Sequence, residues 1–261
     1  MNYNEFLFIV SGQKFAVFGT GFAAESLYQG LVLHDHERNI ACFYVSHPED
    51  GSTFHGIPVC PLSDYRGDIP LLIALHPATL ADISELDGVG ESIYPFLSEY
   101  LYGQPLRENV RISKQDILSV QPEDEYWIAS RYAGVKGLQE DDSFLTDLYL
   151  RCISLHASET TARLRLQELR KLCDNILTRG FDNSGSPICI DENRRIIDGL
   201  HRLAAAAYFD VRDIYCDIYA SSEIFEKVLT ERNRITPAVL VNEGFSREDI
   251  ETLEEIRKKL G

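Results

Sequence analysis

The stretch "RRIIDGLHRLAAAAYF", residues 194–209, joins a short strand to an alanine-rich helix and decides how the second half of the chain folds. The β-branched pair Ile196-Ile197 predicts a strand, and the alanines that follow favour a helix. The sequence Asp-Gly-Leu-His-Arg, residues 198–202, occupies the turn between them. A helix that serves only for packing needs no acid, imidazole and guanidinium at its start, so this turn is a candidate functional site.

The start of this helix is a candidate anion site. The N–H groups from Gly199 to Arg202 have no partner inside the helix, and the helix dipole adds positive potential there. Arg202 costs about 0.3–1 kcal/mol in that first turn unless an anion binds beside it. His201 can donate a hydrogen bond, and Asp198 can hold a metal ion or accept a proton. We expect a phosphate-binding turn made of Gly199, Leu200, His201 and Arg202.

Each of these side chains also has a purely structural interpretation. Asp198 can cap the helix, and Arg202 can pair with Asp198 or with an acid from elsewhere. His201 can be a half-buried histidine whose ring is satisfied by the core. The four residues together, with a cation in an unfavourable dipole position, favour the anion site over these alternatives.

The composition is typical of a soluble globular protein, with 44% hydrophobic and 25% charged residues. The apolar run "LLIAL" is far shorter than the roughly 18 residues of a membrane span, and the N-terminus lacks the basic region of a signal peptide. The six cysteines form no CxxC pair, so we expect reduced thiols and no structural zinc site. These features predict a cytoplasmic protein that does not enter a membrane.

Charge is unevenly distributed along the chain. Residues 1–150 carry 8 Lys and Arg against 22 Asp and Glu, whereas residues 151–261 carry 17 against 19. The formal net charge of −16 repels nucleic-acid backbones at long range, so a nucleic-acid partner is not expected. A local basic cleft in the second half can still hold one small anion. The asymmetry also indicates two structural units.

The first half shows alternating strands and helices, which are typical of βαβ units and a parallel sheet. A polar break at 103–109 separates it from the second half. The expected elements before the break are strands at 15–18, 39–47 and 70–77, a helix over 22–33, and a further strand and turn at 91–103.

After the break, one long amphipathic helix over 158–180 ends in a glycine, and a final helix over 246–259 begins with the capping-box spacing of Ser246 and Asp249. The other expected elements are strands at 110–118, 186–192, 194–198 and 214–220, short helices and acidic loops over 121–150, and a helix near 222–232. The run "EDEYWIASRY" (123–132) is interpreted as an aromatic pocket wall or an interface patch.

A second glycine motif, "GTGFAA", follows the strand at 15–18. Gly19, Thr20 and Gly21 fit the dinucleotide-binding pattern G-x-G-x-x-A, in which glycines let the backbone approach a pyrophosphate. The acid that should end the next strand is replaced by Ser46 and His47. These three residues are therefore a possible nucleotide site, with a structural or partner-binding role as the alternative.

The turn "FGTG" and the segment "CFYVS…HGIPV" make the first half similar to small Rossmann-like domains of bacterial sugar-modifying and polysaccharide-biosynthesis proteins. The segment "ICIDENRRIIDGLHRLAAAAYFDVRDIYCDIY" resembles the core of the ParB/sulfiredoxin superfamily. The resemblances imply an α/β protein with a Rossmann-like parallel-sheet domain (1–103), a ParB/sulfiredoxin-like α+β domain (104–220) and a C-terminal helical extension (221–261).

Within that superfamily, "DGLHR" is closest to the "DGHHR" motif of free-serine kinases. Sulfiredoxins carry a cysteine in this turn, which is absent here, and partition proteins need a basic helix-turn-helix domain downstream. The resemblance implies that Asp198, His201 and Arg202 contact nucleotide phosphates and Mg²⁺, and that a catalytic glutamate is supplied by Glu125 or its neighbour Glu123. Leu200 replaces the first histidine of the kinase motif.

The leading functional expectation is a kinase that uses ATP or another nucleotide, with Mg²⁺ at Asp198, to phosphorylate a small hydroxylated molecule. In this mechanism Asp198, His201 and Glu125 are catalytic. The alternative is a non-catalytic nucleotide-binding or interaction module in a polysaccharide or sugar-modification pathway. A ParB-like DNA-binding protein is the third expectation and the least compatible with the charge. A homodimer and a monomer both remain open.

Overall fold

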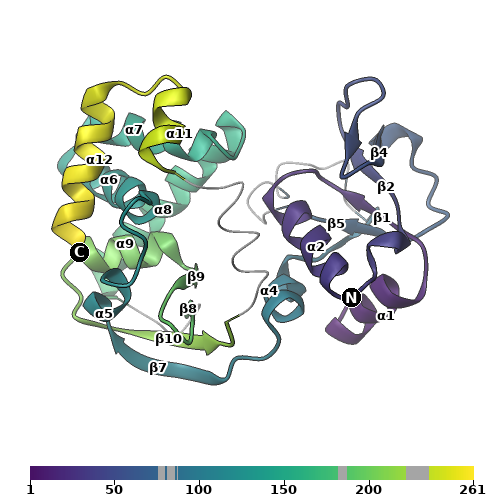
Figure 1. Cartoon of the computed structure of the whole chain (residues 1–261), viewed down its shortest axis with the longest axis horizontal. Helices are drawn as coiled ribbons and strands as arrows, with labels where there is room; N and C mark the ends of the chain where they lie inside the picture. Colours follow the sequence, from purple (N-terminus) through teal and green to yellow (C-terminus); the bar gives the residue numbers. More distant parts are fainter. Residues whose placement is uncertain (76–79, 81–85, 87, 182–186, 222–234) are drawn as a thin grey trace. The chain divides into compact units, whose positions relative to one another are not determined.

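The computed structural model describes residues 1–75, 80, 86, 88–181, 187–221 and 235–261. The chain divides into two compact units, Met1–Gly103 and Gln104–Gly261, and each combines helices with a sheet (Figure 1). The protein is therefore mixed α/β, as expected. Across the described ranges, no helix has both the length and the apolar character needed to cross a bilayer. The predicted helix near 222–232 and the end of the strand predicted at 70–77 lie outside the described residues.

The sheet of the first unit is centred on β1 (Phe15–Phe18), whose four residues are all buried. Its strand order is β3-β4-β2-β1-β5-β6, and every pairing is parallel except the short β3–β4 hairpin. A parallel strand buried on both faces has a continuous apolar sequence, as "FAVF" does. The other strands are β2 (Ile40–Val45), β3 (Thr53–Phe54), β4 (Ile57–Pro61), β5 (Leu71–Ile73) and β6 (Glu91–Ser92).

Three α-helices accompany this sheet in the described part of the first unit. They are α1 (Tyr3–Gly12), α2 (Phe22–Leu33) and α4 (Tyr94–Tyr102), with short 3-10 turns at Glu37–Asn39 and Leu62–Asp64. The predicted helix over 22–33 is confirmed. The strand and turn predicted at 91–103 are wrong, because only Glu91–Ser92 is a strand. Leu97, Tyr100 and Leu101 recur at helical spacing and are buried, so this aromatic segment folds as α4.

The second unit has a four-stranded sheet in the order β7-β10-β8-β9. Strand β10 is antiparallel to β7 and parallel to β8, and β8 forms an antiparallel hairpin with β9. The buried carboxylate of Asp191 closes this hairpin by accepting hydrogen bonds from the backbone N–H groups of Asn193 and Arg195, each at 2.8 Å. The strands are β7 (Arg107–Ser113), β8 (Ile188–Asp191), β9 (Ile196–Asp198) and β10 (Asp213–Tyr219).

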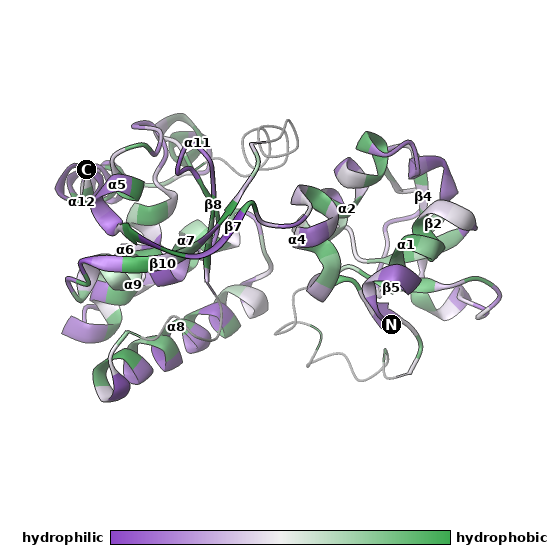
Figure 2. Ribbon diagram, turned by 90° about the horizontal axis from the view of Figure 1, so that it is seen from below, coloured by the Kyte–Doolittle hydropathy of each residue, from purple (hydrophilic) through white to green (hydrophobic). Residues whose placement is uncertain are grey.

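The helices α6, α9 and α12 lie on one side of this sheet (Figure 1). The predicted long helix is confirmed as α8, capped by the Ser158 hydroxyl and ended by Gly180, and hydrophilic and hydrophobic residues alternate along it (Figure 2). The predicted capping box at the start of α12 is also present. The helices described here are α5 (Lys114–Leu118), α6 (Trp127–Glu140), α7 (Ser143–Ser154), α8 (Glu159–Arg179), α9 (Leu200–Tyr208), α11 (Pro237–Asn242) and α12 (Arg247–Leu260).

Two predictions in this unit need correction. The strand predicted at 110–118 is wrong after Ser113. Strand β7 ends at that residue, and the chain continues as the short helix α5. The short helices and loops predicted over 121–150 are mainly two long helices, α6 and α7. Helix α6 is buried almost all round from Ile128 to Val135, so it lacks the one-sided apolar stripe that identifies a surface helix in a sequence.

Helix α6 packs closely on α7 because it carries glycines at the contact. A Cβ atom on Gly134 would lie 2.6 Å from the ring of Tyr149, and one on Gly137 would lie 2.6 Å from the Thr146 hydroxyl oxygen. Helix α6 also contacts α9, whose buried residues are Leu203 and three successive alanines. The small side chains of α6 and α9 therefore let three helices pack against one another.

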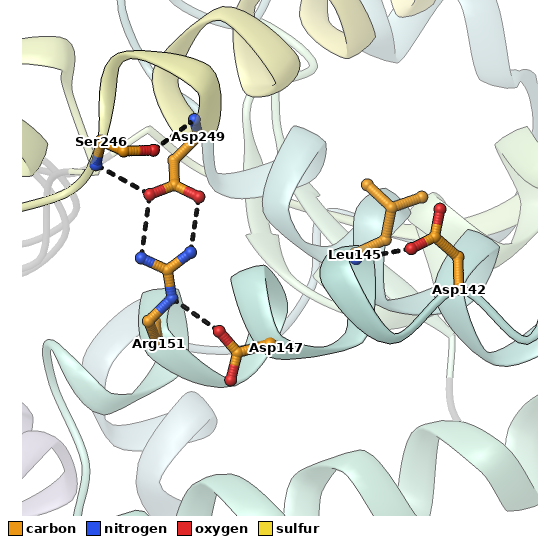
Figure 3. A network of polar contacts seen from close by, with 6 residues as sticks. All are labelled: Asp142, Leu145, Asp147, Arg151, Ser246 and Asp249. Atoms are coloured by element: carbon orange, nitrogen blue, oxygen red, sulfur yellow. Dashed lines mark hydrogen bonds and ion pairs between the residues drawn. The ribbon is translucent and has the colours of Figure 1, made fainter.

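A bidentate ion pair fixes α12 to α7. Arg151 on α7 donates from Nη1 and Nη2 to the two carboxylate oxygens of Asp249, which is 2% exposed (Figure 3). Asp249 also accepts a hydrogen bond from the backbone N–H of Ser246 at 2.8 Å, as part of the capping box. These contacts lower the pKa of Asp249, with the Arg151 hydrogen bonds as the largest cause. The C-terminal helix is thus part of the packed second unit.

Candidate functional site

The turn between β9 and α9 requires a glycine. Gly199 is the N-cap of α9 and adopts the left-handed conformation, with φ of 96°. A Cβ atom at this position would lie 3.1 Å from Cγ1 and 3.2 Å from Cα of Ile188 on the neighbouring strand. Both the backbone conformation and the close approach exclude a larger residue, so the start of α9 is held rigidly against β8.

Within the described structure, no side chain caps the start of α9, and Asp198 is exposed without a hydrogen bond to the helix. The interpretation in which Asp198 caps α9 is therefore wrong. The guanidinium carbon of Arg202 lies 5.7 Å from the centroid of the Phe181 ring, which orients this side chain by a cation–π contact. The first turn of α9 thus presents backbone donors, an exposed acid and a cation.

His201 faces the helices rather than the sheet. Its Nε2 atom lies 2.8 Å from the hydroxyl of Tyr149 on α7, and the two rings meet edge to face. Tyr149 is fully buried, and burial raises its pKa to about 12. The phenol therefore stays protonated at neutral pH and can donate its proton to Nε2. That hydrogen bond favours the His201 tautomer with the proton on Nδ1.

A small, mostly apolar pocket adjoins the same turn. Its volume is about 50 Å³, and Ile196, Ile197 and Leu200 form the wall that belongs to the turn and its strand. Glu125, Arg195 and Arg257 supply charged groups, and Trp127 supplies an aromatic wall. The predicted aromatic pocket wall around residues 123–132 is thus present in part.

The predicted site residues do not all line the same pocket. Glu125 and Leu200 line the apolar pocket, whereas Asp198 and His201 do not belong to its lining. Glu123, the other candidate glutamate, is exposed and also lies outside this lining. The structure therefore brings Glu125 next to the start of α9, and it directs His201 towards Tyr149 instead.

Among the described residues, no group of three or more His, Cys, Asp or Glu side chains could hold a metal ion. Asp198 lies opposite Cys189 in the β8–β9 hairpin. Burial, followed by the nearby charges of Asp198 and Asp217, raises the pKa of the Cys189 thiol to about 12. A thiol in this state is protonated and unreactive at neutral pH.

The two glycines of the first-unit motif differ in the structural reason for which a glycine is needed. Gly19 has φ of 110°, and a Cβ atom there would lie 2.9 Å from the carbonyl oxygen of Ala74. Its N–H already donates to the carbonyl oxygen of Tyr44 at 2.9 Å, so sheet packing accounts for this residue. Gly21 caps α2 and has open space around it, while Thr20 is half-buried. Of the two glycines, only Gly21 has open space beside its backbone.

A buried acid occupies the first turn of α2, beside this motif. Glu25 is 6% exposed, and its carboxylate lies 2.8 Å from Nε2 of His55. The His55 ring stacks on Tyr28 with a centroid distance of 3.9 Å. The carboxylate partly offsets the positive end of the α2 dipole, which weakens the attraction for a pyrophosphate. Sequence reasoning missed this pair because its members lie in different elements.

A second missed feature is the arginine cluster, which we define as Arg131, His156 and Arg165. Arg131 lies on α6, Arg165 on α8, and His156 in the turn between α7 and α8. The sequence does contain a signal for it. Arg131 is the single cation in a run of small, apolar and aromatic residues whose composition is typical of a buried core. Only the packing of α6 against α8 shows that the three side chains share one region.

Comparisons of the chain with models of known protein families, with curated proteins and with solved structures found no match. The resemblances to the ParB/sulfiredoxin superfamily and to Rossmann-like domains accordingly remain proposals. The chemistry of the site rests on its own residues and geometry.

Proposed function

We propose that the second unit binds a nucleotide through its phosphates at residues 198–202 and transfers a phosphoryl group to a small hydroxylated molecule. The observation that carries this proposal is the start of α9. A left-handed glycine opens the helix, no side chain caps it in the described structure, and the exposed Asp198 stands beside it. Backbone donors at a helix start attract phosphate, and an adjacent carboxylate can hold the Mg²⁺ that accompanies it.

The topology of the second unit supports a ParB/sulfiredoxin-like fold. Helix α8 leads into the β8–β9 hairpin, α9 follows directly, and β10 returns parallel to β8. This order of elements is the one that the resemblance predicts. For the first unit, the parallel order β4-β2-β1-β5-β6 supports a Rossmann-like fold, with Gly19, Thr20 and Gly21 where the strand order reverses.

Each residue of the turn has a role in this mechanism. The backbone from Gly199 to Arg202 and the Arg202 guanidinium hold the phosphates of ATP or another nucleotide. Asp198 holds Mg²⁺ or takes the proton of the acceptor hydroxyl, and His201 stabilises the transferred charge. Glu125 lines the adjoining pocket and is the second candidate base for the acceptor.

The adjoining pocket fits the acceptor better than the nucleotide base. Its volume of about 50 Å³ exceeds several-fold the roughly 10–15 Å³ that one water needs, but it is small for a purine. Apolar walls with a few charged groups suit a small molecule that must be oriented. We therefore assign the acceptor to this pocket and the phosphates to the start of α9.

The test is a thermal-shift screen of nucleotides with Mg²⁺ on the wild type, Arg202→Ala and Arg163→Ala. Arg163 is an exposed arginine paired with Glu159 on α8, so its variant is a matched control. We expect nucleotide to stabilise the wild type and the control but not Arg202→Ala. Equal stabilisation of all three proteins would refute the site.

A non-catalytic nucleotide-binding module in a polysaccharide or sugar-modification pathway is the second candidate. It is favoured by the isolation of Asp198, which has no cluster of further metal ligands in the described structure. Tight nucleotide binding without phosphate transfer to any of a broad set of alcohols, sugars and hydroxyamino acids would select this candidate. A DNA-binding role is disfavoured by the net charge of −16.

A further inference from the structure

Arg131 is a buried arginine with no carboxylate partner among the described residues. It is 4% exposed, and its Nη1 atom donates only to neutral acceptors, the Ser130 hydroxyl at 3.0 Å and the Trp127 carbonyl at 3.5 Å. Its guanidinium carbon lies 5.3 Å from the centroid of the Trp127 ring, and its buried Nε has no hydrogen-bond partner in the described part of the chain. A buried charge is costly unless it is paired, so this arrangement calls for an anion.

The other two members of the arginine cluster also have buried nitrogen atoms without a hydrogen-bond partner in the described structure. These are the Nε atom of Arg165 and the Nε2 atom of His156. The His156 ring stacks on Trp127, with centroids 6.0 Å apart and an interplanar angle of 16°. Three polar groups from three elements are therefore left without a hydrogen bond in the described structure, and two of them, in Arg131 and His156, belong to side chains that contact Trp127. Buried polar groups in proteins are almost always hydrogen-bonded.

The electrostatics of the cluster agree with this geometry. The pKa of Arg131 is lowered to about 10, mainly by burial, and Arg165 contributes to the lowering as a nearby positive charge. Burial and the two arginines together lower the pKa of His156 to about 4. The negative charge of Glu168 contributes to the raised pKa of Tyr149, which lies near Arg131, but the Glu168 side chain itself is exposed. A chain with a net charge of −16 thus holds, in its described part, a cluster of positive groups without a paired carboxylate.

We propose that the arginine cluster is a binding site for a small dianionic oxyanion of the phosphate class. Two guanidinium groups match a dianion in charge, whereas a single carboxylate would neutralise only one of them. A tetrahedral oxyanion also offers several acceptors, enough for the Nε atoms of Arg131 and Arg165 and for His156. The source of the anion is inorganic phosphate or a small phosphate monoester.

This site differs from the phosphate site proposed at residues 198–202. It uses side chains of α6, α8 and the turn between α7 and α8, and none of the residues of the turn before α9. Tyr149 lies between the two, because its hydroxyl contacts His201 and its pKa responds to both Arg131 and Arg165. The proposal is therefore independent of the proposed phosphotransferase activity, and each can fail without the other.

The test measures the binding of inorganic phosphate to the full chain by thermal shift and titration calorimetry. The variants are Arg165→Gln and, as matched control on the same helix, Arg163→Gln. We expect phosphate and sulfate to raise the Tm of the wild type and the control, and acetate to leave it unchanged. Arg165→Gln should weaken phosphate binding at least tenfold. Glycerol phosphate is the monoester probe, and tighter binding than inorganic phosphate would identify a monoester as the source.

Arg131→Met adds a second readout. Replacing an uncompensated buried charge by an apolar side chain of similar length should leave the Tm without phosphate unchanged or raise it, while phosphate binding is lost. If Arg131→Met does not fold, phosphate binding by Arg165→Gln is the measurement that tests the proposal. The proposal is overturned if phosphate fails to stabilise the wild type or if Arg165→Gln binds it normally. Loss of binding in Arg202→Ala but not in Arg165→Gln would place the phosphate at the turn before α9 instead.

Discussion

The Tyr149 hydroxyl lies 2.8 Å from Nε2 of His201 and connects α7 to the first turn of α9. The contact depends on α6, because Gly134 leaves the space that the Tyr149 ring fills. The orientation of a predicted site residue is thus set by helices that the local sequence around residues 194–209 does not contain. His201 acts in the proposed mechanism only if this hydrogen bond holds its ring in place.

Tyr149→Phe should remove that restraint while keeping the ring. We expect a loss of about 0.5–1.5 kcal/mol in the free energy of unfolding, as for one buried hydrogen bond, measured by urea denaturation. The ¹⁵N chemical shifts of the His201 imidazole should also change, because its tautomer is no longer selected by the phenol. Unchanged His201 shifts would show that Tyr149 does not determine the tautomer.

Gly134→Ala should destabilise the protein although alanine favours helices. The new methyl group would lie 2.6 Å from the Tyr149 ring, and overpacking of this kind costs about 1–3 kcal/mol. The matched control is Gly12→Ala at the end of α1, where the nearest atom would be 3.9 Å away. Thermal denaturation should show a lower Tm for the first variant and an unchanged or higher Tm for the second. A stabilised Gly134→Ala would contradict the close packing of α6 on α7.

The stability of the protein should depend on the protonation of His156. Burial and the charges of Arg131 and Arg165 lower the pKa of His156 from 6.5 to about 4 in the folded state. The unfolded chain therefore binds a proton between pH 6.5 and 4 that the folded chain does not, and stability falls as the pH falls through this range. Because His156 is only half-buried, solvent screens the two arginine charges and keeps the contribution well below about 3 kcal/mol.

The measurement compares unfolding of the wild type and His156→Gln by urea at several pH values. The difference in unfolding free energy between the two proteins should be constant above pH 7 and should shift in favour of the variant as the pH falls to 4. A difference that does not vary with pH would mean that His156 titrates normally. Bound phosphate should reduce the effect, because an anion raises the pKa of a neighbouring imidazole.

Asp249→Asn should detach α12 from α7. The carboxylate is nearly inaccessible and holds Arg151 with two hydrogen bonds, so breaking the pair costs about 2–3 kcal/mol. This is below the cost for a fully buried pair because Arg151 still reaches solvent. Arg247→Gln removes a solvent-exposed pair with Glu251 and should cost far less than the Asp249 variant. Chemical denaturation measures the unfolding free energy of each variant. Equal losses in the two variants would show that the buried pair stabilises the protein no more than the surface pair does.

The sequence predicted those elements whose causes are local. The strand at 15–18, the helix over 22–33 and the caps of α8 and α12 all follow from patterns a few residues long. The errors fall where local patterns mislead. The aromatic residues of α4 suggested a strand, and the evenly buried α6 lacks a polar face that would mark it as a long helix.

The sequence by itself determined the turn at residues 198–202. A left-handed glycine, a strand before it and an alanine helix after it are local properties, and they place the start of α9 without reference to the remainder of the chain. Only the tertiary structure decided what surrounds that turn. The contact between Tyr149 and His201 and the arginine cluster join side chains from separate segments. Their positions depend on how helices pack and rotate about their axes, and no single segment of sequence specifies this.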